Sequence, residues 1–154
     1  MNPYQFRVSL RLKHPTKDLS FATQQLGLKP SQQWTSGEPR ITRAGSPLEG
    51  VYRESYWVAS LLGGNLQDST QQSLDEALET ILQVLSRHTL FLEEFRRDGG
   101  SLYVFVGIFG PKNFGLEFSP ALLSELGLAG LELGLDVYPG GAHDVSPDAW
   151  DATD

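Results

Sequence analysis

The sequence predicts one α+β domain, in which a mostly antiparallel sheet carries helices packed on one face; a ferredoxin-like arrangement is one candidate. The first reason is length, because 154 residues suit a single domain. The second is that several segments alternate apolar and polar residues, as half-buried strands do. The third is that segments with helix-capping residues lie between them. We assign residues 1–139 to the domain and 140–154 to an acidic, flexible C-terminal tail.

The first third of the chain predicts a strand, a helix and a long loop. Residues 6–13 alternate apolar and polar side chains, which indicates a strand. A helix is expected over 17–26, because Gly27 suits its C-terminal end. A short strand is expected over 33–35, and 36–50 are expected to form a loop, since glycine and proline recur there.

The rest of the domain predicts two further helical regions within the sheet. A strand is expected over 51–61. The run Ser73-Leu74-Asp75-Glu76 is a capping box, which predicts a helix over 74–87. The elements expected after it are a short helix over 90–97, strands over 102–109 and 114–118, a helix over 120–126 and a last strand over 131–138.

In a ferredoxin-like arrangement the first and last strands are neighbours. That pairing would bring Arg7 and Arg11 of the first strand close to Glu132 and Asp136 of the last strand. The two arginines and the two acids would then form cross-strand ion pairs.

Composition excludes several classes of function but does not identify one. The chain has no cysteine, which excludes disulfides, thiolate metal sites and cysteine nucleophiles. Its 12 basic and 19 acidic residues give a net charge of −7, so we expect no nucleic-acid partner. Without an apolar run long enough for a membrane span and without a signal peptide, we expect a cytoplasmic protein with no membrane partner.

No catalytic motif is recognisable, so we assign no catalytic residue and leave enzymatic activity undecided. The three histidines, His14, His88 and His143, lie far apart and lack the spacing of metal ligands. We therefore predict no metal and no cofactor.

One candidate binding surface is the sheet face that points away from the helices. If the aliphatic residues face the helices, the opposite face carries a mixed set of side chains: Arg7, Ser9, Arg11, Tyr103, Phe105, Glu132, Asp136 and Tyr138. Exposed aromatic and charged residues favour a protein or small-molecule contact. The alternative is internal ion pairing, with the 36–50 loop or a second subunit covering the face, which leaves a homodimer open.

A second candidate surrounds the predicted loop. Trp34 and Glu38 could line a ligand site, together with Arg40, Arg53 and Trp57. The alternative is that Trp34 packs into the core, as tryptophan commonly does.

Several motifs resemble one known family. They are Leu26-Gly27-Leu28-Lys29-Pro30, Trp34, Gly37-Glu38, Trp57, Leu126-Gly127-Leu128 and Leu135-Asp136-Val137-Tyr138. Their order and spacing resemble the bacterial family called domain of unknown function 4279, over about residues 5–138. The resemblance implies no activity and no catalytic residue.

Two functional hypotheses follow. The first is a non-enzymatic module that binds a protein partner, in an immunity-like or inhibitor-like role. The second is a small-molecule binder or enzyme with a pocket formed by residues 34–57. The absence of a catalytic motif favours the first.

Overall fold

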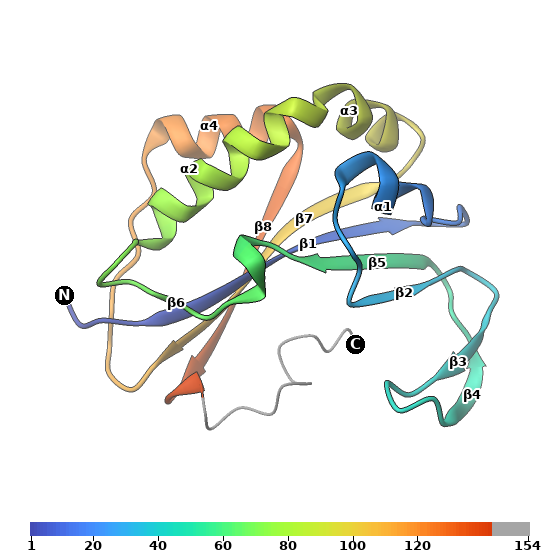
Figure 1. Cartoon of the computed structure of the whole chain (residues 1–154), viewed down its shortest axis with the longest axis horizontal. Coiled ribbons are helices and arrows are strands. Elements are labelled where there is room, and N and C mark those ends of the chain that lie inside the picture. The colour runs from blue at the N-terminus through green and yellow to red at the C-terminus, as the bar shows by residue number, and fades with distance from the viewer. Residues whose placement is uncertain (143–154) are drawn as a thin grey trace.

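The computed structural model describes residues 1–142, so residues 143–154 of the predicted tail lie outside the described residues. The described chain forms one mixed sheet, a separate two-stranded hairpin and a layer of helices (Figure 1). In chain order the elements are β1 Gln5–His14, α1 Phe21–Leu26, β2 Gln32–Trp34, β3 Pro39–Ile41, β4 Pro47–Val51, β5 Ser55–Ser60, η1 Leu62–Gly64, β6 Gln67–Asp68, α2 Leu74–Leu85, η2 Ser86–His88, α3 Thr89–Arg97, β7 Ser101–Gly110, α4 Pro120–Ala129 and β8 Leu131–Pro139.

The main sheet has the strand order β2-β5-β1-β7-β8, and β6 pairs with the beginning of β1. Its pairings are antiparallel except that of β7 with β8, which are parallel and joined through α4. The predicted α+β class with a mostly antiparallel sheet is therefore confirmed. The expected contact between the first and last strands is wrong, because the crossover through α4 places β8 beside β7 and leaves β7 between β1 and β8.

The core lies between the sheet and the helices, which share one face in Figure 1. The predicted first strand is confirmed as β1, and its apolar residues Phe6, Val8, Leu10 and Leu12 are at most 2% exposed. The alternating aliphatic residues of β7 pack beside them, and α2 contributes six buried residues to the same cluster. Both central strands therefore present one aliphatic side to the helices.

The first helix begins later than predicted. α1 starts at Phe21, because the side chains of His14 and Asp18 bind the backbone N–H groups of Thr16, Lys17 and Ser20 instead. The carboxylate of Asp18 accepts hydrogen bonds from the backbone N–H and the hydroxyl of Ser20, at 2.8 and 2.6 Å. Short acidic side chains favour such turns over helix. Gly27 ends the helix with φ of 65°, as predicted.

The next helical region agrees closely with the prediction. The capping box at Ser73 is present, with both Ser73 and Glu76 bonded to the backbone. α2 ends at Leu85, and α3 extends over Thr89–Arg97. Apolar residues recur at helical spacing in both helices, and in α2 they follow the capping box.

The predicted loop over 36–50 is wrong, because most of it forms the hairpin β3–β4. Pro39 pairs with Val51, and Ile41 pairs with Pro47, across an irregular register. Val51 therefore belongs to β4, and the following strand β5 begins only at Ser55.

Two predictions in the C-terminal part also need correction. Residues 114–118 form no strand, although Phe114, Leu116 and Phe118 pack against the core. They alternate because every second side chain is partly buried, yet they have no ladder partner. The helix α4 continues through Gly127 to Ala129, and Gly130 caps its C-terminal end with φ of 68°. The predicted last strand is confirmed as β8.

Candidate functional site

The strand register gathers the predicted polar and aromatic residues on the sheet face that carries no helix. Arg11 lies opposite Tyr103, Ser9 opposite Phe105, and Arg7 opposite Gly107. On the next strand, Glu132, Asp136 and Tyr138 lie opposite Tyr103, Gly107 and Phe109. Residues directly opposite in paired strands point to the same side of a sheet. We call the resulting surface, formed by Arg7, Ser9, Arg11, Tyr103, Phe105, Phe109, Glu132, Asp136 and Tyr138, the aromatic–arginine face.

Arg11 lies at the centre of this face. Its guanidinium carbon is 3.6 Å from the centroid of the Phe105 ring, and its Nε donates to the Ser9 hydroxyl at 3.4 Å. Arg11 is only 5% exposed. The Phe105 ring itself lies over Gly134, where a Cβ atom would approach Cδ2 of that ring to 3.0 Å. The glycine therefore makes room for the ring on which Arg11 stacks, a geometry that favours a guanidinium.

Tyr138 occupies the end of β8 on the same face. Its ring stacks on Phe109 with a centroid separation of 5.2 Å, and its hydroxyl donates to Oδ2 of Asp136 at 2.6 Å. Burial and the neighbouring carboxylate raise the pKa of Tyr138 to about 12. Burial also raises the pKa of Tyr103, with Glu132 adding to the effect. Both phenols are therefore hydrogen-bond donors at neutral pH.

Trp34 lies at the edge of the sheet in an aromatic stack. Its ring is 4.4 Å from that of Tyr52 and 4.6 Å from that of Tyr56, centroid to centroid. Its indole N–H donates to the carbonyl of Glu54 at 3.2 Å. Trp34 is partly exposed, so it is neither fully buried in the core nor fully open to a ligand. The stack joins the sheet to the hairpin, because Tyr52 directly follows β4.

The Tyr52 hydroxyl fastens the hairpin to this stack. It accepts from the Ile41 N–H at 3.3 Å and donates to the Ile41 carbonyl at 3.2 Å. All residues of β3 and β4 are exposed, and the large apolar side chains of Ile41, Leu48 and Val51 are 51%, 44% and 54% exposed. In Figure 1 the hairpin projects beyond the edge strand β2. The hairpin is therefore an apolar arm that packs little against the core.

The remaining predicted loop residues lie around the hairpin base, with one exception. The Glu38 carboxylate accepts from the Thr35 N–H at 2.9 Å, while Arg40 and Arg53 are exposed. Trp57 is fully buried among the helices, where its indole N–H donates to the Thr23 hydroxyl at 3.1 Å. Because alternate residues of a strand face opposite ways, Trp57 lies on the other side of the sheet from Tyr56.

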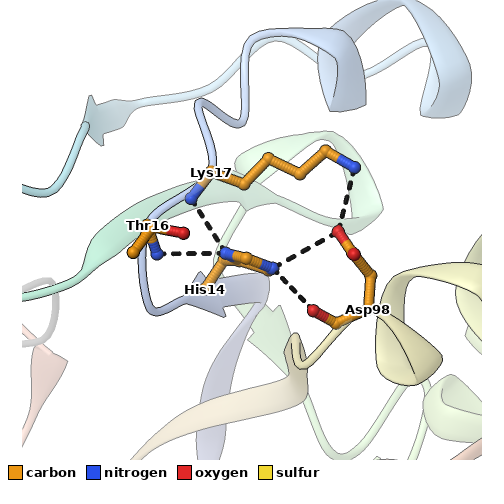
Figure 2. A network of polar contacts seen from close by, with 4 residues as sticks. All are labelled: His14, Thr16, Lys17 and Asp98. Atoms are coloured by element: carbon orange, nitrogen blue, oxygen red, sulfur yellow. Dashed lines mark hydrogen bonds and ion pairs between the residues drawn. The ribbon is translucent and has the colours of Figure 1, made fainter.

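A polar cluster at the far end of β1 is structural (Figure 2). Nδ1 of the buried His14 accepts from the N–H groups of Thr16 and Lys17, at 3.1 and 2.8 Å. This pattern places the ring proton on Nε2, which donates to the Asp98 carbonyl at 2.9 Å. Lys17 also pairs with the Asp98 carboxylate at 3.0 Å, which lowers the pKa of that carboxyl. The cluster joins the end of β1 to the turn before β7.

Two cavities lie away from the predicted site residues. One, of about 400 Å³, is lined by Tyr4, Ser73 and Phe118 among others. The other, of about 590 Å³, lies among α2, α3 and α4. Within residues 1–142, no group of three or more His, Asp or Glu side chains is arranged to hold a metal ion. No helix described here is long and apolar enough to cross a membrane.

Sequence reasoning missed the parts of the site that depend on pairing. Tyr52 and Tyr56 were visible as aromatic residues four apart, but their stacking on Trp34 requires β2 to pair with β5. The hairpin was signalled only by its turn residues, including Gly45 with φ of 88°. Each of its strands begins with a proline, a residue that argues against a strand when only the sequence is read.

A model of the family described as domain of unknown function (DUF4279) matches residues 4–140. The chain belongs to the DUF4279 family. The DUF4279 match extends from just before β1 to just after β8, so it includes the hairpin and the whole aromatic–arginine face. No match was found among curated proteins or among solved structures.

Proposed function

We propose that this DUF4279 protein is a non-enzymatic module that binds a protein partner through its projecting hairpin and through the aromatic–arginine face. The observation that carries the proposal is the exposure of both hairpin strands, including Ile41 and Val51, which are more than half exposed. Two-stranded hairpins are marginal when they stand alone. Here Tyr52 and the Trp34 stack hold such an arm in place although it adds little to the core.

The chemistry of the aromatic–arginine face suits a protein contact. Aromatic and arginine side chains are enriched in the centres of protein interfaces. Phe105 and Tyr138 are partly exposed on the aromatic–arginine face, and the Tyr138 hydroxyl is oriented by Asp136. Arg11 is nearly buried and supports the Phe105 ring on which it stacks. The net charge of −7 favours a basic protein over a nucleic acid. We favour an immunity-like or inhibitor-like role in the cytoplasm. A chain without cysteine forms no disulfides and so needs no oxidising compartment.

The alternative, a small-molecule pocket formed by residues 34–57, has less support. Glu38 and Arg40 are exposed, and each is bonded to nearby backbone, at Thr35 and at the Glu49 carbonyl. Neither of the two cavities described above is lined by these residues.

Affinity purification of the tagged full chain from its native host tests the proposal. We expect one protein to co-purify in equimolar amount with the wild-type chain. The double variant Ile41→Asp with Val51→Asp should lose most of it, because charges on the arm oppose its burial. Val84→Asp is the matched control, since Val84 is 48% exposed but lies on α2. Equal recovery with the wild type and the arm variant would refute the proposed surface.

A further inference from the structure

The helix layer contains an apolar groove that the proposed function does not use. This groove has a volume of about 590 Å³ and lies where α2, α3 and α4 meet. Its apolar lining includes Leu85, Leu92, Leu128 and Ala129. Leu85 and Leu92 are each 3% exposed and belong to the core, whereas Leu128 is 80% exposed. The groove therefore extends from an exposed leucine at the rim to the hydrophobic core.

The charged residues that line the groove are all acidic. Glu93 extends from α3 and Glu125 from α4, so carboxylates come from two of the three helices. The other polar lining residues, Gln83, Ser86 and Thr89, are uncharged, and no lysine or arginine lines the groove. An apolar floor with acidic walls is complementary to a segment whose apolar residues are flanked by cations.

We infer that this groove is a second docking site, which accepts a basic amphipathic helix from a partner protein. An amphipathic helix places apolar anchors on one side, as a groove of this kind requires. Lysine or arginine residues beside those anchors would then meet Glu93 and Glu125. A second copy of this chain is a poor occupant, because its net charge of −7 opposes the approach of another acidic chain.

The groove shares no lining residue with the arm or with the aromatic–arginine face. The helices α2, α3 and α4 lie over one face of the sheet (Figure 1), and the groove lies among them. The aromatic–arginine face is on the opposite side of the sheet. Variants of the two surfaces can therefore be tested separately, and failure of one leaves the other intact.

The experiment measures binding of a fluorescent peptide to the full chain by anisotropy. The probe is an amphipathic helix of leucine and lysine about 18 residues long, or roughly 27 Å. Two matched peptides replace its lysines by glutamate or its leucines by serine. We expect the leucine–lysine peptide to bind, to weaken as salt rises, and to exceed both matched peptides in affinity.

Leu128→Asp separates groove docking from general attraction between opposite charges. It adds a negative charge, so attraction alone predicts tighter binding of the basic peptide. Docking in the groove predicts weaker binding, by about tenfold, because the apolar rim is lost. The folding control is Leu90→Asp, since Leu90 is 69% exposed on α3 and does not line the groove; it should not weaken binding.

Two charge variants complete the test. Glu93→Gln with Glu125→Gln should weaken binding of the leucine–lysine peptide at low salt. Glu94→Gln with Glu117→Gln removes the same charge from exposed residues outside the groove and should have less effect. The inference is overturned if the basic peptide fails to bind, if Leu128→Asp leaves its affinity unchanged or increases it, or if both charge pairs weaken binding equally.

Discussion

His14 shows how one side chain fixes the end of a central strand. Its imidazole accepts from two backbone N–H groups and donates to the Asp98 carbonyl while almost fully buried. In the sequence, His14 directly follows the strand predicted over 6–13. Its partner Asp98 is 84 residues away, a pairing that no local pattern contains.

Replacing His14 by alanine should lower the free energy of unfolding by about 2–3 kcal/mol, because buried backbone groups lose their partners. His14→Asn should recover part of that loss, since its side-chain oxygen can accept near the position of Nδ1. Urea denaturation of both variants measures the difference. Equal losses would show that ring volume, rather than hydrogen bonding, is what His14 contributes.

Tyr138 provides a test of the aromatic–arginine face by titration. Its pKa of about 12 lies above the ordinary value of 10.0, because of burial and the Asp136 carboxylate. The stability that this shift contributes is therefore complete below pH 10 and is lost as pH rises toward 12. Asp136→Asn should lower the Tyr138 pKa, as followed by carbon NMR of the tyrosine ring. An unchanged pKa would mean that the 2.6 Å contact is not maintained in solution.

At the scale of elements, the hairpin depends on Tyr52. Tyr52→Phe keeps the ring that stacks on Trp34 but removes the hydroxyl bonded to Ile41. We expect the Ile41 amide to exchange with solvent about fivefold faster, which corresponds to about 1 kcal/mol of local stability. The melting temperature should barely change, because the hairpin contributes little to the core. Tyr103→Phe serves as the control, and a slower or unchanged Ile41 amide would contradict this role for Tyr52.

Alanine substitutions at two glycines distinguish the cost of backbone strain from the cost of steric crowding. Gly27 ends α1 with φ of 65° and open space around its missing Cβ, so Gly27→Ala should cost about 1 kcal/mol from backbone strain alone. At Gly100 a Cβ would clash with the ring of Phe95, which is 4% exposed. Gly100→Ala should therefore cost about 2–3 kcal/mol. Denaturant titration compares the two, and a smaller loss at Gly100 would mean that the ring moves easily.

The elements that sequence predicted well are those defined by local signals. The alternation in β1 and β7 and the capping box at Ser73 each depend on neighbouring residues. The start of α1 was misplaced, because the turn at Asp18 competes with helix formation. The segment 114–118 alternates like a strand, but an alternating pattern reports burial and cannot supply a pairing partner.

At the scale of the whole molecule, the sequence predicts which side chains share the aromatic–arginine face but not which strands lie side by side. Period-two patterning assigns Arg11 and Tyr138 to one face without knowledge of strand order. The place of β7 between β1 and β8, and the separation of Trp57 from Trp34, follow from pairings between distant segments. The molecule thus has two surfaces of different chemistry, one with arginine and aromatic residues and one apolar with acidic walls.

The proposed function requires that the arm bind a macromolecule rather than a small molecule. NMR of the nitrogen-15-labelled chain in extract of its native host tests this directly, after ultrafiltration has separated macromolecules from small molecules. We predict that the amide signals of Ile41 and Val51 shift or broaden with the macromolecular fraction and remain unchanged with the filtrate. Shifts caused by the filtrate alone, or no change with either fraction, would contradict the proposal.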